Sequence, residues 1–512
     1  MNALARTLLL ALGSGAAIGF SPGQDVPEPA GSACGVMAGD VVADAAVIWG
    51  RADGSARMQV DWRRRGEQDW ATVDGPAALE TSDFTAKTVL RGLPPSAEIE
   101  YRVRFASLED PGGVTHSGAG SFRTAPAAEG GRETQRFAWS GDTAGQGWGI
   151  DLDRGGMRIY ETIRAARPDF FIHSGDLIYA DNPLQDEVVL DDSSVWRNRV
   201  TPSKRKVAET LEEFRGNFRY NLLDENLRRF HAEVPLIVQW DDHETTNNWY
   251  PGERLLEDAR YTVKSAALLA ARSRRALFEY TPIRVLPDDP ERIYRRIPRG
   301  PQLDVFVIDQ RSYRGVNTFN RQGERDSDTA FLGDAQLSWL QKELAASRAT
   351  WKIVASDIPI GLVVPDGEEA FEGMANGDDG PPRGRELEMA ELLSFLKRSG
   401  VRNVVWLTAD VHYAASHYYD PEQAAFQDFD GFWEFVSGPL HAGTFGPNPV
   451  DGTFGLQARF VGIPEGMRPN RSPAEGHQFF GFCTLEGETG LLRVEHRNAA
   501  GKTLWAIELN AE

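Results

Sequence analysis

The stretch Pro235-Leu-Ile-Val-Gln-Trp240-Asp241-Asp242-His243-Glu244 joins a short apolar run to a cluster of acidic residues and a histidine. An apolar run of this length followed by polar residues is typical of a buried β-strand. The acidic cluster would then lie just past the carboxyl end of the strand, where open α/β sheets bind their ligands. The stretch therefore indicates both the class of fold and the place of a site.

The same arrangement recurs along the chain. Buried strands are predicted from further apolar runs at residues 136–140, 169–173, 303–308, 351–355 and 403–408. Helices are predicted from amphipathic stretches at residues 157–167, 334–347 and 385–399. This alternation predicts an α/β domain with a strongly buried sheet. Five of these strands, counting 235–240, are followed by a carboxylate: Asp142, Asp176, Asp242, Asp357 and Asp410.

The two ends of the chain have a different pattern. Residues 33–125 contain short alternating strands with turn-rich connections, which predict a small β-sandwich. Residues 125–132 are typical of a linker, and residues 478–485, 491–496 and 503–509 predict further strands. Residues 181–226 are expected to form a long loop that shapes a cleft. The predicted division is a leader at 1–30, a β-sandwich domain at 31–127 and a catalytic domain at 133–512.

Composition excludes several classes of protein. The 512 residues include 75 acidic and 55 basic side chains, a formal net charge of −20, which disfavours a nucleic-acid scaffold. Two cysteines rule out a disulfide framework or a Cys-rich metal module, although Cys34 and Cys483 could pair or remain buried thiols. The first 20 residues resemble a secretory leader, so a periplasmic or secreted location is expected. No run is long and apolar enough to predict a transmembrane segment, and the oligomeric state is open.

The carboxylates that follow the strands point to bound cations. A single aspartate in this position is usually a turn former or a helix cap. Five carboxylates at one sheet edge would repel one another unless cations neutralised them. With His412 and Tyr179 nearby, the oxygen and nitrogen donors suit Fe, Mn, Zn or Ca. There are enough donors for two ions, with Asp176 central enough to bridge them.

These motifs resemble a known family of enzymes. Gly-Asp142, Gly-Asp176-Leu-Ile-Tyr179, Asp-Asp-His-Glu244 and Asp-Val-His412 are similar to the calcineurin-like metallophosphoesterases. The stretch Trp240-Asp-Asp-His-Glu-Thr-Thr-Asn-Asn-Trp249 resembles, more narrowly, the PhoD-type alkaline phosphatase/phosphodiesterase family. The resemblance implies an α/β sandwich of two mixed sheets flanked by helices, preceded by a small all-β domain like an immunoglobulin or fibronectin domain.

The resemblance also implies a set of metal ligands. Asp142, Tyr179 and His412 would hold one ion, with Asp176 as the bridge. Asp242 and Asp410 would hold the second ion, with Asp357 as a further ligand by its position. The family combination is Fe(III) with Ca²⁺. Because Asp142 stands where relatives often have a cysteine, Zn²⁺ or Mn²⁺ is a further possibility at the second site.

Other residues are expected to act on the substrate. His243 would donate a hydrogen bond or a proton to the phosphate or the leaving oxygen. Asn247 or Asn248 could contact the substrate or complete coordination, and simple turn chemistry explains either equally well. Arg311 and Arg314 could bind phosphate through bidentate contacts, and a structural ion pair is at least as good an alternative for either.

The predicted activity is hydrolysis of phosphate monoesters or diesters by attack of a metal-activated hydroxide. Two alternatives remain from the sequence. The same fold could serve a phospholipase D-like enzyme or a nucleotide phosphodiesterase. The chain could also be a Ca²⁺-stabilised binding protein of the cell envelope without catalytic activity.

Overall fold

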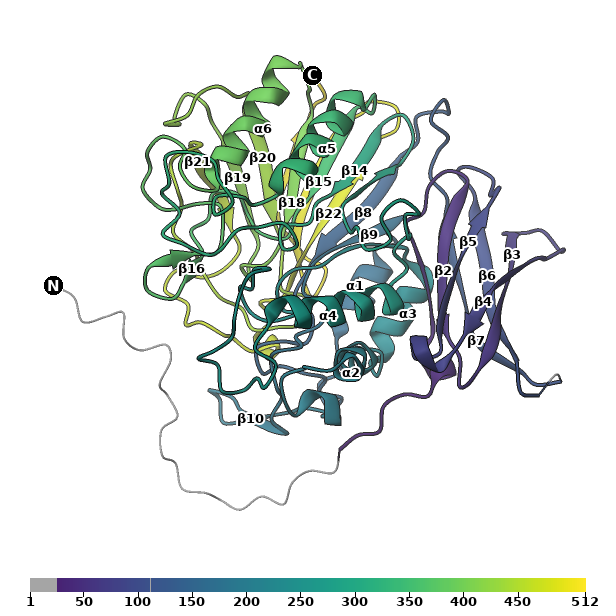
Figure 1. Ribbon diagram of the computed structural model, residues 1–512. Helices are drawn as coiled ribbons and strands as arrows, with labels where there is room; N and C mark the ends of the chain where they lie inside the picture. The colour runs from purple at the N-terminus through teal and green to yellow at the C-terminus, as the bar shows by residue number, and fades with distance from the viewer. Residues whose placement is uncertain (1–24, 111) are drawn as a thin grey trace.

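Two large mixed β-sheets pack face to face at the centre of the molecule. The computed structural model describes residues 25–110 and 112–512 (Figure 1). The predicted leader at 1–30 lies largely outside these residues. The nine-stranded sheet has the order β24 (Thr503–Leu509), β23 (Leu492–Asn498), β22 (Phe479–Leu485), β8 (Gln135–Ser140), β9 (Phe170–Ser174), β12 (Leu236–Gln239), β1 (Val36–Gly39), β2 (Ala45–Arg51) and β5 (Thr85–Arg91). The seven-stranded sheet has the order β13 (Arg295–Pro298), β14 (Leu303–Val307), β15 (Trp351–Ala355), β18 (Val404–Thr408), β20 (Phe432–Val436), β19 (Ala415–Tyr419) and β21 (Leu456–Val461).

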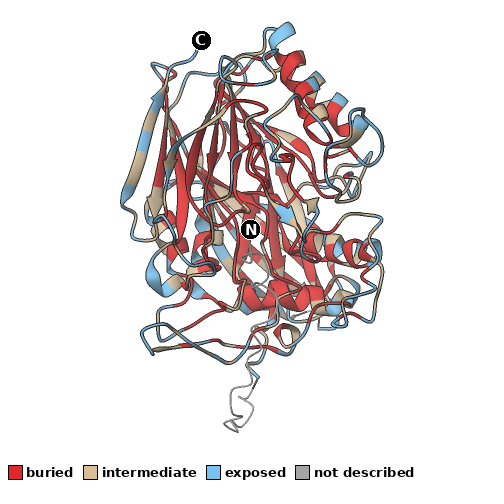
Figure 2. Cartoon of the chain, turned by 90° about the vertical axis from the view of Figure 1, so that its left-hand side faces the viewer, coloured by how far each residue is buried: buried red, intermediate tan, exposed pale blue. Residues whose placement is uncertain are grey.

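Apolar side chains of the two sheets meet between them. Trp139 of β8 and Ile172 of β9 share one buried cluster with Val307 of β14, Ile353 of β15 and Leu407 of β18. The burial pattern of these strands is continuous, which is why they read as unbroken apolar runs in the sequence. Figure 2 shows this buried interior running through the centre of the molecule.

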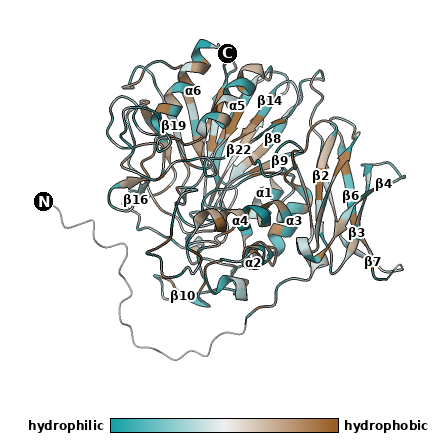
Figure 3. Cartoon of the chain, in the orientation of Figure 1, coloured by the Kyte–Doolittle hydropathy of each residue, from teal (hydrophilic) through white to brown (hydrophobic). Residues whose placement is uncertain are grey.

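Helices cover the outer faces of both sheets. The helices are α1 (Arg158–Ala165), α2 (Leu211–Asn221), α3 (Glu225–Glu233), α4 (Ala266–Tyr280), α5 (Gly333–Ala346) and α6 (Glu386–Arg398). Helices α1 to α4 share a core with the nine-stranded sheet, and α5 and α6 share another with the seven-stranded sheet. Apolar and polar residues alternate along α5 and α6 (Figure 3), as expected of helices with one buried face. The predicted sandwich of two mixed sheets flanked by helices is confirmed.

The leading strands form the predicted all-β part, but they are not separate from the large sheet. The four-stranded sheet β4 (Ala71–Ala78), β3 (Ala56–Arg64), β6 (Glu98–Ser107) and β7 (Val114–Arg123) packs against β1, β2 and β5. Strand β1 pairs in parallel with β12 through Gly39 and Leu236. The central sheet therefore continues into the N-terminal sandwich, at the right of Figure 1.

The segment 181–226 is more ordered than the expected long loop. It contains a two-stranded sheet, β10 (Glu187–Val189) with β11 (Val195–Arg197), and helix α2. Thr210 and Glu213 form a capping box at the start of α2, a signal already present in the sequence. A second small hairpin pairs β16 (Pro365–Asp366) with β17 (Ala370–Phe371).

Two further expectations concern cysteines and membrane spans. Cys34 and Cys483 are free and buried, so the alternative in which they pair is not observed. Within residues 25–110 and 112–512, no helix has the length and apolarity needed to cross a bilayer.

Candidate metal centre

The parallel strands bring the predicted site residues to one edge of the two sheets. Ser140 of β8 is level with His173 of β9, and Ala355 of β15 is level with Leu407 of β18. Asp142, Asp176 and Asp410 follow these strands within two residues, and all three have positive φ angles of 69°, 52° and 62°. His412 also has a positive φ, of 63°. Residues other than glycine rarely adopt a positive φ angle. Where they do, they are often found at functional sites.

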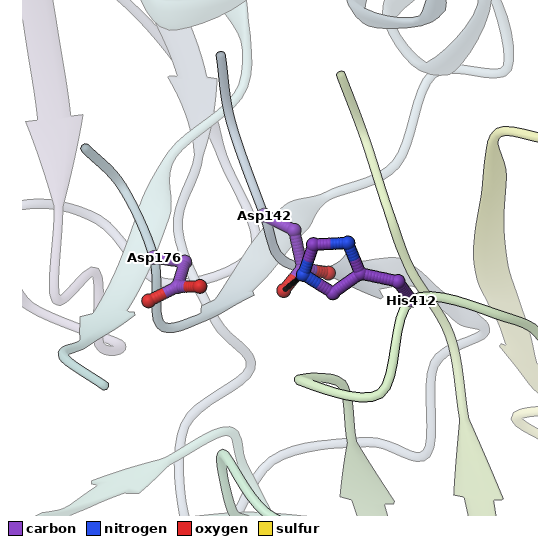
Figure 4. Close-up of side chains that lie close together, drawn as sticks. All are labelled: Asp142, Asp176 and His412. Atoms are coloured by element: carbon purple, nitrogen blue, oxygen red, sulfur yellow. Dashed lines mark ion pairs between the residues drawn. The ribbon is translucent and has the colours of Figure 1, made fainter. Parts of the chain in front are cut away.

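The carboxylates and histidines form three overlapping groups that could hold metal ions. The first contains Asp142, Asp176 and His412, whose side chains converge in Figure 4. The second contains Asp176, Asp242 and His243, and the third contains Asp241, Asp242 and Asp410. Within each group the candidate ligand atoms lie within 4.8 Å of one another. Asp176 and Asp242 each belong to two groups, so adjacent sites would share them.

Several carboxylate oxygens of the site lack a hydrogen-bond partner. Within the described residues, both carboxylate oxygens of Asp142 and of Asp357, and Oδ1 of Asp242, are buried without one. Burial and neighbouring carboxylates such as Asp241 raise the pKa of Asp142, Asp176, Asp357 and Asp410 well above the usual range. Bound cations would satisfy these oxygens and remove the repulsion, so the donor set fits hard or intermediate metal ions.

Tyr179 and His412 lie together beside the first group. The Tyr179 hydroxyl oxygen is 2.8 Å from Nε2 of His412, and both side chains are buried. Burial lowers the pKa of His412 to about 4, so its ring is neutral, the form that binds metals. Its Nδ1 bonds to the carbonyl of Gly443, which leaves Nε2 for the first group. Burial and nearby Asp176 and Asp142 raise the pKa of Tyr179.

His243, a member of the second group, is held by a carboxylate outside that group. Its Nδ1 lies 2.7 Å from Oδ1 of the buried Asp181, and its ring stacks on Tyr179 at 4.3 Å between ring centroids. Burial alone would lower the pKa of His243, but Asp181 and Asp242 outweigh it and raise the pKa to about 10. Asp181 and Asp242 therefore favour the protonated imidazole, which can donate a proton or a hydrogen bond.

The chain matches one protein family over most of its length. Residues 137–496 match the PhoD-like phosphatase family, and residues 21–126 match the PhoD-like phosphatase N-terminal domain. The chain belongs to the PhoD-like phosphatase family. Alkaline phosphatase D of Bacillus subtilis (strain 168) is 26% identical over 432 residues, which cover 80% of this chain and 69% of that protein. Membership confirms the predicted family and the prediction of a metal-dependent phosphoester hydrolase.

Solved structures share the fold of this PhoD-like phosphatase. A structure of PhoD aligns with a TM-score of 0.68 at 20% identity, over 95% of this chain and 90% of that one. A purple acid phosphatase from yellow lupin (Lupinus luteus) aligns with a TM-score of 0.55 at 13% identity, over 93% of this chain and 73% of the other. At these identities the likeness establishes the fold.

The predicted substrate contacts of the PhoD-like phosphatase lie in different environments. Asn247 is exposed, and its backbone N–H donates to Oδ2 of Asp181 at 3.0 Å. Arg311 is fully buried and forms ion pairs with Asp241 and Glu372. Asp357, predicted as a metal ligand, is outside the three groups, and its Oδ2 lies 3.6 Å from Nε of Arg311.

Four acidic residues of the PhoD-like phosphatase site were not predicted. Asp241 and Glu244 are neighbours of Asp242, and the Asp-Asp-His-Glu motif could have indicated them. Glu244 accepts the N–H groups of Leu177 at 2.5 Å and Asp241 at 2.8 Å, which ties two site loops together. Asp181 stood in the sequence only as part of an acidic loop, and no local signal marks Glu372, which follows the small hairpin β16–β17.

Proposed function

We propose that this enzyme hydrolyses small phosphate monoesters or diesters at a centre of two or more metal ions. The observation that carries the proposal is the pair of shared carboxylates, Asp176 and Asp242, which link three ligand groups into one centre. Ions held this close together, when bound, supply an activated water and stabilise negative charge on the phosphoryl oxygens.

The ligand assignments are those that the family resemblance implies, and the three groups support Asp142, Asp176, His412, Asp242 and Asp410 as members of the set. Asp142, Tyr179 and His412 would hold one ion, and Asp242 and Asp410 would hold the other, with Asp176 between them. Asp357 would be a further ligand, supported by its two buried oxygens, neither of which has a hydrogen-bond partner within the described residues. We propose Fe(III) and Ca²⁺ as the pair, with Zn²⁺ or Mn²⁺ as the alternative second ion. The oxygen-rich surroundings of Asp410 favour a hard ion there.

His243 would act as the general acid. Its protonated ring is oriented by Asp181 through Nδ1, so Nε2 is the nitrogen left to face a reacting oxygen. The stacked Tyr179 ring fixes the plane of the imidazole. His243 can then protonate the leaving oxygen as the ester bond breaks. Asn247, exposed next to this pair, is proposed to contact the substrate.

The enzyme is proposed to be exported and to consist of two domains. We propose export to the periplasm or outside the cell, supported by the apolar N-terminal stretch of the sequence. We also retain 31–127 and 133–512 as the two domains, with the shared central sheet joining them. The net charge of −20 disfavours a long nucleic-acid substrate, but cations at the centre would attract a small phosphoester locally.

A substrate panel tests the proposed activity. An aryl phosphate, a bis-aryl phosphate, a nucleotide and a phospholipid are offered to the metal-loaded wild type and to Asp176→Asn. Turnover of the aryl phosphate or the bis-aryl phosphate that is lost in Asp176→Asn supports the proposal. Turnover confined to phospholipid, or unchanged in Asp176→Asn, would contradict it.

A further inference from the structure

A buried arginine lies among the acidic residues of the centre. Arg311 follows strand β14 by four residues, and its backbone N–H donates to Oδ1 of Asp309 at 3.1 Å. Its side chain has no exposed surface. Burying a guanidinium so completely is costly unless carboxylates compensate its charge.

The guanidinium of Arg311 contacts carboxylates on two sides. On one side its Nε donates to Oδ1 of Asp241 at 2.6 Å, and its terminal nitrogen lies 3.9 Å from Oδ1 of Asp242. On the other side it forms an ion pair with Glu372. Asp241 and Asp242 are two of the three members of the third metal group, which Asp410 completes.

Arg311 is poorly placed to contact the substrate. A phosphate contact requires N–H groups that are open to the substrate. The side chain of Arg311 is closed to solvent, and its terminal nitrogens form ion pairs with Asp241 and Glu372, although neither nitrogen makes a hydrogen bond within the described residues. Of the carboxylates near its guanidinium, Asp241 and Asp242 belong to the third metal group.

We propose that Arg311 is a positioning residue for the second metal ion, and this inference rests on the proposed function. Three carboxylates this close together repel one another and would splay apart. The guanidinium holds Asp241 and keeps Asp242 beside it, so both face Asp410.

Arg314 provides a matched control. It is also buried, lies three residues along the chain and is close to Glu372, with 3.7 Å between the ion-paired atoms. Among the ion pairs of the described residues it has none with Asp241 or Asp242. A general loss of buried positive charge would affect Arg311→Gln and Arg314→Gln alike. A positioning role would affect only Arg311→Gln.

The test measures metal binding rather than turnover alone. The purified metal-loaded wild type, Arg311→Gln, Arg311→Lys and Arg314→Gln are dialysed against a series of Ca²⁺ concentrations, and all bound metals are counted by mass spectrometry. Arg311→Gln should bind the second ion about 10- to 100-fold more weakly, the usual effect of losing a partner of a metal ligand. The first ion should be retained, Arg314→Gln should match the wild type, and Arg311→Lys should lie between wild type and Arg311→Gln.

Kinetics and unfolding complete the design. At saturating Ca²⁺, Arg311→Gln should recover its KM for an aryl phosphate, because the arginine does not touch the substrate. Unchanged Ca²⁺ affinity with a raised KM would overturn the inference and assign Arg311 to the substrate, and tighter Ca²⁺ binding would also overturn it. Thermal unfolding checks that each variant is folded. If Arg311→Gln does not fold, the same measurements are made on Arg311→Lys. A wild type that binds fewer than two ions would refute the proposed function instead.

Discussion

Nδ1 of His243 lies 2.7 Å from Oδ1 of Asp181, and both side chains are buried. Asp181 is itself fixed, because it accepts the backbone N–H of Asn247 at 3.0 Å and the side-chain amide of Asn182 at 2.9 Å. The carboxylate therefore fixes the Nδ1 edge of the imidazole and favours its protonated form. This pairing gives His243 the properties of a general acid.

Asp181→Asn should reduce general acid catalysis by His243 without abolishing it. The neutral amide no longer stabilises the imidazolium, so the pKa of His243 should fall from about 10. An acid must be protonated to act, and the alkaline limb of the pH profile of kcat should therefore move to lower pH. The loss in kcat should reach about 10²-fold, the lower end of general acid catalysis.

The control for this change is Asn182→Ala, which removes a contact to Asp181 but none to His243. Its pH profile should follow that of the wild type. An alkaline limb that stays in place in Asp181→Asn would show that Asp181 does not set the protonation of His243.

Metal stoichiometry should depend on which group a carboxylate belongs to. Asp142 belongs only to the first group and Asp410 only to the third, and the proposed assignment places Asp176 between the two ions. We expect Asp142→Asn and Asp410→Asn each to lose a different ion, and Asp176→Asn to weaken both. Elemental analysis after dialysis measures this, with the exposed Asp334→Asn as control. Loss of the same ion from Asp142→Asn and Asp410→Asn would refute the grouping.

The N-terminal sandwich should be required for stability of the whole chain. Asp40, at the end of β1, is fully buried and forms a two-pronged ion pair with Arg295 of β13, at 2.7 and 2.8 Å. Asp40→Asn would leave Arg295 buried without its counter-charge, at a cost of about 3–5 kcal/mol in the free energy of unfolding. Urea unfolding measures this cost. The double variant Asp40→Asn/Arg295→Met should recover part of it, and an additive double variant would contradict the pairing.

Lys87 should make stability depend on pH. Its ammonium donates to the carbonyls of Phe278 and Thr281, and burial lowers its pKa from 10.5 to about 7. Between these values the unfolded chain binds more protons than the folded chain, so the free energy of unfolding rises with pH in that window. The slope is at most about 1.4 kcal/mol per pH unit.

Lys87→Met should lose this rise, while Lys502→Met, at an exposed lysine, should keep it. Urea unfolding at pH 7.5 and pH 9 compares the three proteins. Equal slopes for wild type and Lys87→Met would show that Lys87 does not titrate in this range.

The sequence predicted the parts of the fold that local patterns determine. The strands that end near Asp142, Asp176 and Asp410 are apolar on both faces, and burial between two sheets produces that pattern directly. Helix α2 was missed because its apolar residues are few, although the Thr210–Glu213 capping box marked its start. The pairing of β1 with β12 had no local signal, because register between strands depends on tertiary packing.

Site residues that directly follow a strand were predictable from the sequence. Residues that contact those side chains from distant parts of the chain were not. Asp181 contacts His243 and Glu372 contacts Arg311, and these contacts join positions 62 and 61 residues apart. Spacing in a sequence carries no information on contacts of that kind. The role of Arg311 could be inferred only when its burial was known.

Stepwise reconstitution of the metal-free chain tests the central claim most directly. Metal is added in known equivalents, and bound ions per chain and the rate of aryl phosphate hydrolysis are measured on the same samples. A centre with shared Asp176 and Asp242 predicts that hydrolysis appears only as the second ion binds. In Asp176→Asn, neither binding of the second ion nor hydrolysis should be observed. Full hydrolysis with one ion or none per chain would contradict the account.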